Sequence, residues 1–225
     1  MFCEKTFEFL IENRFRNSRQ WFLDNKETYN NFVFKPLQQL ATALAPTIYQ
    51  IDNQIITEAK TDKTISRIYR DTRFSKDKML YREEMWLSFK RDKKAFPHYP
   101  EFFIVISPEY FLYGCGYYAP TTSAMESLRN LILKNDISFE KALKSYEKQS
   151  TFVLDGDKYK RSKFHDKPEK IKDWLDRKNI SLIHQSKDLN QLFSKDITQK
   201  ISKDLLLTEN IYSLFIKAET LAQLK

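Results

Sequence analysis

The sequence predicts an α+β protein in a single domain that spans residues 1–225. Apolar residues recur at the three-to-four spacing of amphipathic helices before residue 50 and again after residue 120. Between them, four short runs either alternate between apolar and polar residues or are largely apolar, which is typical of strands. No internal repeat or linker-like stretch divides the chain. We therefore expect an antiparallel sheet over about residues 66–118, packed by N-terminal and C-terminal helices.

The N-terminal part is expected to be helical. Aromatic and aliphatic residues at helical spacing predict a first helix over residues 4–14. Ser18 is a suitable N-cap for a second, longer helix, because its hydroxyl can accept a free backbone N–H of the first turn. Pro36 interrupts this helix, and a third helix follows over residues 37–48 as a continuation or a kink.

The middle and the C-terminal part follow in order. The four strands are expected over residues 66–74, 81–91, 102–106 and 110–118. After them the pattern predicts a helix from Thr121 or Thr122 to about Lys134, a helix from Asp136 or Ser138 to about Lys148, a small hairpin over residues 152–161, a helix over 168–177, a short strand over 180–184 and closing helices over 188–223.

Three features allow both a packing and a ligand-binding interpretation. Trp21 and Tyr29 could form a stacking platform for a base or a sugar, but their spacing is that of a buried helix face, and we favour core packing. Gly114 and Gly116 would allow a ligand to approach the backbone, but isolated glycines in strands usually mark a bulge or twist, which we favour. Cys115 would act as a nucleophile only beside a base, and we do not favour that role.

The stretch from Arg67 to Tyr81 holds three arginines, two lysines, two aspartates and two tyrosines. As a strand, it would place Arg67, Asp71 and Arg73 on one face and Arg70 on the other. The rigid guanidinium fork matches a carboxylate or a phosphate, so this row suits either an internal ion network or an anion site. The candidate anion-binding residues are Arg67, Arg70, Arg73, Lys78 and Tyr81, with Asp71 and Asp77 as structural or orienting residues.

This stretch resembles the signature R-x-x-R-D-x-R-F-x-x-[D/N]-K-x-x-Y of a bacterial family, domain of unknown function 2461. The matching positions are Arg67, Arg70, Asp71, Arg73, Phe74, Asp77, Lys78 and Tyr81. Weaker similarities are Trp21-Phe22 with Lys26, Tyr29 and Pro36, then Gly114, Gly116 and Pro120, and finally Lys160-Arg161 through Pro168. The chain departs from the pattern at two places. Leu80 stands where proline is expected, and the pair Lys163-Phe164 lacks the expected glycine. The resemblance implies that this chain shares the fold and the site of the family, but it implies no activity.

The chain is basic, with a net charge of +8 and a pI near 9.2. This charge suits a phosphorylated ligand, a nucleic acid or an acidic partner, and equally a lysine-rich solvated surface. With only three glycines, the chain lacks a glycine-rich phosphate loop or dinucleotide fingerprint. A secondary basic patch comprises Lys158, Lys160, Arg161 and Lys163. Tyr159 and Phe164 lie between these charges, which suits phosphate contacts with stacking, or else a lysine-protected sheet edge.

The two cysteines, Cys3 and Cys115, and the three dispersed histidines form neither a disulfide framework nor a zinc spacing. We therefore predict no metal site and no cofactor. A cytoplasmic location is expected, because no secretion signal or apolar stretch of membrane-spanning length is present. The oligomeric state is left open.

For the signature we favour a structural ion network in which Asp71 and Asp77 pair with the arginines. The alternative is a binding site for a phosphate-containing ligand or a nucleic acid. A third interpretation is a phosphoester-processing enzyme in which Asp71 or Asp77 acts as a base or carries Mg²⁺. Arginines that converge on an open pocket would support binding, whereas arginines saturated by aspartates and carbonyls would support the network.

Overall fold

A computed structural model describes residues 1–224 of the chain. The chain forms two compact units, each assembled from separate segments. Unit 1 contains Met1–Phe89, Phe103–Tyr113 and Gln185–Ser202. Unit 2 contains Lys90–Phe102, Gly114–His184 and the described residues from Lys203 onward. A single domain over residues 1–225 stays a prediction.

Unit 1 begins with the predicted helices. They are α1 (Glu4–Arg16), α2 (Arg19–Asp24), α3 (Lys26–Tyr29), the π-helical turn η1 (Asn30–Phe34) and α4 (Lys35–Ile51). The Ser18 hydroxyl accepts the Trp21 N–H and caps α2, as predicted. Pro36 lies in the first turn of α4, and the Phe32 carbonyl, which a helical N–H at this position would contact, accepts the Thr6 hydroxyl at 2.6 Å instead. The helical conformation continues from η1 through Lys35 into α4, so the third helix follows as a continuation.

Over residues 1–224 the sheet has five strands: β1 (Met85–Phe89), β2 (Glu101–Ile106), β3 (Phe111–Gly116), β4 (Val153–Asp155) and β5 (Ser181–Ser186). Their order in the sheet is β1-β2-β3-β5-β4, and the fold is α+β with an antiparallel sheet, as predicted. The prediction of a strand over residues 66–74 is wrong, because that segment forms only isolated bridges. Of the residues 81–91 that were predicted to form a strand, only Met85–Phe89 (β1) do so.

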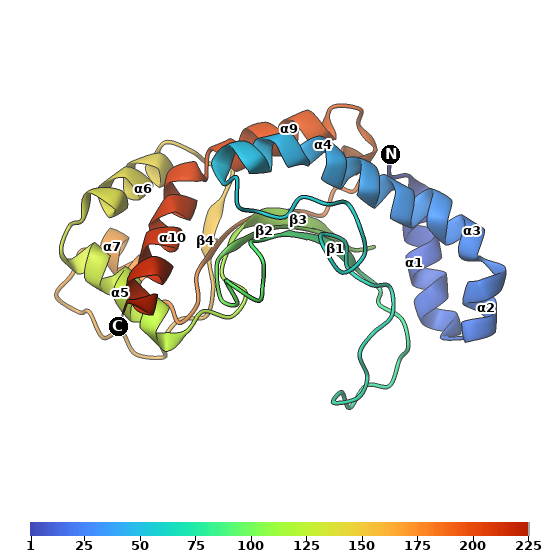
Figure 1. Ribbon diagram of the computed structural model, residues 1–225, viewed down its shortest axis with the longest axis horizontal. Helices are drawn as coiled ribbons and strands as arrows, with labels where there is room; N and C mark the ends of the chain where they lie inside the picture. The colour runs from blue at the N-terminus through green and yellow to red at the C-terminus, as the bar shows by residue number, and fades with distance from the viewer. Residues whose placement is uncertain (225) are drawn as a thin grey trace. The chain divides into compact units, whose positions relative to one another are not determined.

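Unit 2 contains α5 (Thr122–Leu133), α6 (Ile137–Glu147), α7 (Glu169–Leu175) and α10 (Glu209–Gln223). Helix α10 packs against α5 and α6, as Figure 1 shows. Thr121 and Asp136 cap α5 and α6 through their side chains, and each is one of the two residues that the sequence offered for the start of its helix. Two further helices, α8 (Asn190–Phe193) and α9 (Ile197–Leu206), precede α10.

The prediction of a hairpin over residues 152–161 is wrong. Strand β4 pairs instead with β5, so that Val153 lies opposite Ile183 and Asp155 opposite Ser181. The expected second arm of the hairpin is irregular, with one isolated bridge between Lys158 and Arg177. The partner strand of β4 thus lies far along the chain, and turn residues next to β4 in the sequence could not predict it.

Gly114 and Gly116 lie where β3 passes close to β5. A Cβ at Gly114 would lie 1.8 Å from the Leu182 carbonyl oxygen, and one at Gly116 would lie 2.4 Å from the Ser181 Cα. Gly116 also has a φ of 155°, in the region that favours glycine. The close approach that these glycines permit is therefore to the neighbouring strand.

None of the helices over residues 1–224 is long and apolar enough to cross a membrane.

We expect Gly114→Ala to lower the free energy of unfolding by about 1–3 kcal/mol, because the added methyl group must push β5 away from β3. Chemical denaturation measures the change. The exposed Ser150→Ala is the matched control and should leave the midpoint unchanged. Equal stability of Gly114→Ala and the wild-type protein would contradict the close packing of these strands.

Candidate functional site

The signature segment is an irregular hairpin in unit 1. Tyr69 and Tyr81 form an isolated antiparallel bridge. On either side of it, the Arg70 N–H donates to the Leu80 carbonyl at 2.8 Å, and the Arg82 N–H donates to the Ile68 carbonyl at 2.9 Å. Residues 71–79 form the loop between the two arms, drawn in teal in Figure 1, where its tip extends away from α4. The charged residues of the signature are therefore displayed on a loop.

Asp77 is the carboxylate at which the loop meets helix α1. Its Oδ2 accepts hydrogen bonds from Arg14 at 2.9 Å and from Arg70, and its Oδ1 accepts the Met79 N–H at 2.9 Å. The pKa of the Asp77 carboxyl is held well below its usual 3.8, first by the Met79 N–H and then by the two guanidinium groups. Asp77 is thus fully ionised and shared by two cations.

Two further hydrogen bonds fasten the second arm to α1. Arg14 also donates to the Tyr81 carbonyl at 3.0 Å. Asn17, which ends α1 with a left-handed φ of 47°, accepts the Leu80 N–H through its side-chain oxygen at 2.7 Å. Asparagine tolerates this backbone conformation, so one residue both ends the helix and holds the loop.

Aromatic packing supports the same junction. The Phe22 ring of α2 lies 5.2 Å from the Tyr81 ring and 5.4 Å from the Tyr69 ring, measured between centroids. Tyr81 is fully buried, and burial raises its pKa to about 12, with the neighbouring Tyr69 adding to the effect. The Tyr29 pKa is raised to about 12 for the same two reasons. Trp21 also contacts Phe9, at 5.5 Å, so the aromatic residues of α2 and α3 are packed within unit 1.

The outer arginines have separate partners. Arg67 forms a two-pronged pair with Asp62, and Arg73 forms one with Asp71 at 2.7 and 3.0 Å. The side chains of Arg67 and Arg73 are 65% and 76% exposed. The two hydrogen bonds from the Arg73 side chain, followed by its backbone N–H, lower the Asp71 pKa to about 2. Lys78 donates to the Thr72 carbonyl at 2.9 Å.

The arginines therefore do not converge on one point. Arg67, Arg70 and Arg73 each bind a different carboxylate, and the expected row in which Asp71 orients both Arg67 and Arg73 is replaced by separate pairs. Asp62 and Arg14 are partners that sequence reasoning missed. No local pattern marks them, because Asp62 lies before the signature and Arg14 lies in the last turn of α1.

The tip of the loop exposes an aromatic ring. The Phe74 side chain is 94% exposed, and the Arg73 guanidinium lies 5.8 Å from its ring centroid. Lys76, also exposed, has no salt bridge within the described part of the chain. The tip thus combines an apolar ring with two positive charges.

The secondary basic patch lies in unit 2. Lys158 forms a salt bridge with Asp173 at 2.5 Å. Lys163 extends over the ring of Tyr159, with its Nζ 4.2 Å from the ring centroid. Lys160 and Arg161 are exposed and form no salt bridge with any residue that the structure describes. The structure therefore separates the paired Lys158 from three cations without carboxylate partners.

Cys115 lies in the interior of unit 2. Burial raises its thiol pKa to about 12, so the thiolate that would act as a nucleophile is strongly disfavoured. Over residues 1–224, no group of three or more His, Cys, Asp and Glu side chains is arranged to hold a metal ion.

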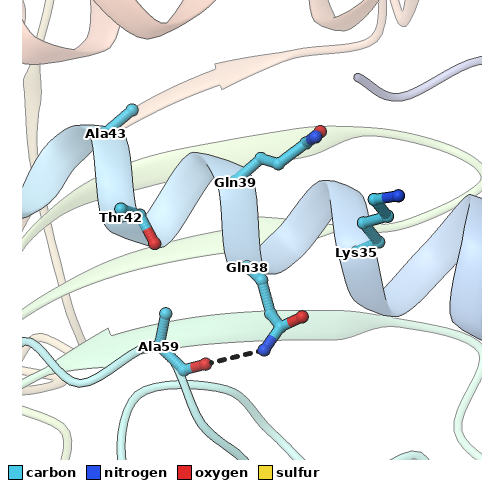
Figure 2. A pocket seen from close by; sticks show the side chains of 6 residues that line it. All are labelled: Lys35, Gln38, Gln39, Thr42, Ala43 and Ala59. Carbon is cyan, nitrogen blue, oxygen red and sulfur yellow. Dashed lines mark hydrogen bonds between the residues drawn. The ribbon is translucent and has the colours of Figure 1, made fainter.

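A shallow hollow of about 580 Å³ lies along α4. It is lined by Lys35, Gln38, Gln39, Thr42, Ala43 and Ala59. Figure 2 shows Gln38 extending from the helix to donate a hydrogen bond to the Ala59 carbonyl at 3.1 Å. The lining contains no residue of the signature, so this hollow and the charged loop are separate features.

The family comparison covers both units. A family profile described as conserved hypothetical protein (DUF2461) matches residues 5–213. A search of the curated proteins found no match. The match includes Arg14 in the last turn of α1 and Asn17 at its C-cap, as well as the whole signature hairpin that these two residues contact. The chain therefore belongs to the family of domain of unknown function 2461.

Proposed function

We propose that the inner part of the signature is a structural ion network that fixes the hairpin on α1. The observation that carries this proposal is the Asp77 carboxylate, which accepts hydrogen bonds from Arg14 of α1 and Arg70 of the hairpin. Sharing one carboxylate between two guanidinium groups joins segments that lie 63 residues apart in the chain. On this interpretation the protein acts through the surface that the hairpin displays.

The surroundings of Asp77 support a structural role. The Arg14 and Arg70 side chains are each 23% exposed, and their positive charges are already opposed by Asp77. Charge-assisted hydrogen bonds of this kind are stronger than neutral ones, and the loss of one partner leaves the others partly buried and unpaired. The outer pairs differ, because exposed ion pairs contribute little to stability.

A second candidate function is the binding of a phosphate-containing ligand or a nucleic acid at the tip of the loop. The specific observation in its favour is the exposed Phe74 between Arg73 and Lys76. A phosphate presents oxygens in nearly the same arrangement as a carboxylate, so it can replace Asp71 on the Arg73 fork. Single-stranded nucleic acids add stacking of a base on an exposed ring.

Asp77→Asn should loosen the hairpin, because the neutral amide cannot balance two guanidinium groups. We expect faster hydrogen exchange at the amides of Arg70, Leu80 and Arg82 and a lower melting temperature. Asp71→Asn is the matched control, since it removes an exposed carboxylate from the same loop and should change neither quantity. A hairpin that exchanges equally in both variants and the wild-type protein would refute the structural role of Asp77.

The same contact predicts a pH dependence. The Asp77 pKa is lower in the folded protein than its ordinary 3.8, so its contribution to stability is present above about pH 4 and is lost as the pH falls through the lowered pKa. The Met79 amide, which donates to Asp77, should report this titration in nuclear magnetic resonance spectra. Asp77→Asn should abolish the transition. A midpoint at or above 3.8 in the wild-type protein would contradict the arrangement.

If the loop tip binds phosphate, phosphorylated ligands should stabilise the fold by about 2.7 kcal/mol at a hundredfold excess over the dissociation constant. Thermal shift at low salt, with nucleotides, sugar phosphates, inorganic phosphate and single-stranded DNA and RNA, measures the effect. It should weaken as salt rises, because bound phosphate releases counterions.

Arg73→Gln should remove the stabilisation. Arg16→Gln is its matched control, since Arg16 is also an exposed arginine of unit 1 paired with a carboxylate. Loss of the shift in Lys160→Gln/Arg161→Gln, with no loss in Arg73→Gln, would assign binding to the secondary basic patch and remove the proposal for the tip. No shift with any ligand would have the same consequence.

A further inference from the structure

A cluster of positive charges surrounds the ring of Tyr159 in unit 2. The Lys163 Nζ lies 4.2 Å from the ring centroid, the Arg129 guanidinium carbon lies 5.4 Å from it and the Lys178 Nζ lies 5.9 Å from it. The negative face of an aromatic ring attracts a cation, and all three side chains lie within the distance of this interaction. One neutral ring therefore gathers three charges that repel one another.

Hydrogen bonds hold the ring and the arginine in place. The Tyr159 N–H donates to the Asp176 carbonyl at 2.9 Å. Arg129 donates through Nε to the Leu175 carbonyl at 3.0 Å, and through Nη2 to the Arg177 carbonyl and the Tyr159 hydroxyl. These acceptors are neutral, so they orient the guanidinium without balancing its charge. Its Nη1 forms no hydrogen bond with the described residues.

The two lysines have no carboxylate partner. Lys163 and Lys178 are exposed, and neither forms a salt bridge with a residue that the structure describes. In contrast, the neighbouring Lys158 and Arg177 both pair with Asp173. The carboxylate of Asp176 is nearby but 7% exposed, and it accepts the backbone N–H of Lys163. The charges near Tyr159 thus remain incompletely neutralised.

We propose that Tyr159, Arg129, Lys163 and Lys178 form an anion site that binds phosphate groups. A bound phosphate would accept hydrogen bonds from the free donors of the three cations and relieve their mutual repulsion. The same chemistry is offered by a free phosphate ligand and by the backbone of a nucleic acid. Lys160 and Arg161, exposed in the same loop, extend the positive surface as a polyanion requires.

This inference is independent of the function proposed for the signature. The Tyr159 site lies within unit 2, whereas Asp77 and the tip of the loop lie within unit 1. It also changes the patch expected from sequence, because Lys158 is paired, while Arg129 and Lys178 come from other parts of the chain.

The test compares two double variants of equal charge. Lys163→Gln/Lys178→Gln removes the two free amines, and Lys141→Gln/Lys148→Gln removes two exposed lysines of unit 2 that also have no salt bridge with the described residues. Binding of inorganic phosphate and pyrophosphate is measured by calorimetry. Binding of short fluorescent single-stranded DNA and RNA is measured by anisotropy, at several salt concentrations.

We expect the Lys163/Lys178 variant to weaken binding about tenfold or more, and the control to weaken it less than about twofold. For an oligonucleotide, the slope of affinity against salt should fall by about one for each lysine that contacts a phosphate. Arg16→Gln, which removes an exposed arginine of unit 1, should leave this binding unchanged. Tyr159→Leu, which keeps every charge, should also weaken binding, since the ring no longer gathers the cations; its melting curve checks that it folds.

Each outcome of this experiment either supports the anion site at Tyr159 or contradicts it. Loss of phosphate or pyrophosphate binding in the Lys163/Lys178 variant identifies a site for a free phosphate ligand. Loss confined to oligonucleotides identifies a site for a nucleic-acid backbone. Equal weakening in the two double variants would show that general charge suffices and would overturn the proposal, as would a wild-type protein that binds none of these probes at low salt.

Discussion

The signature hairpin meets helix α1 at the Asp77 carboxylate, and in the function that we propose the arrangement of the hairpin depends on this contact. This carboxylate opposes the charges of Arg14 and Arg70 and also accepts a backbone N–H of its own loop. The two oxygens of a carboxylate offer about four lone-pair sites, so they can accept all three hydrogen bonds at once. Asn17 and Phe22 add a polar and an apolar contact at the same junction. These contacts attach the base of the loop to α1 and α2.

Attachment at the base leaves the end of the loop free to meet other molecules. The outer arginines, Arg67 and Arg73, are paired but largely exposed, and such pairs exchange partners at little cost. Phe74 has no comparable stabilisation in the free protein, since its ring faces water. A tight base with a solvated tip is the arrangement expected of a binding element, because function concentrates on loops that a rigid scaffold positions.

The positive surface around Tyr159 follows a different physical principle. At Asp77 opposite charges meet, whereas at Tyr159 like charges gather on a neutral ring. At Asp77 the opposite charges are paired within the chain, which is why we propose a structural role for it. At Tyr159 some donors and charges have no partner among the described residues, which is why we propose that an anion binds there. A net charge of +8 is consistent with both, and only the local partners distinguish them.

Local patterns in the sequence determined the α+β class, the N-terminal helices, the cap at Ser18, the starts of α5 and α6 to within one or two residues, and the signature as a charged site. These follow from interactions between residues a few positions apart. The tertiary structure alone decided that β4 pairs with β5 and that residues 66–74 form no strand. It also decided that Arg14, rather than a residue of the signature row, shares Asp77 with Arg70. Such contacts join distant segments, and their energies depend on burial and on the other charges nearby, which no local spacing specifies.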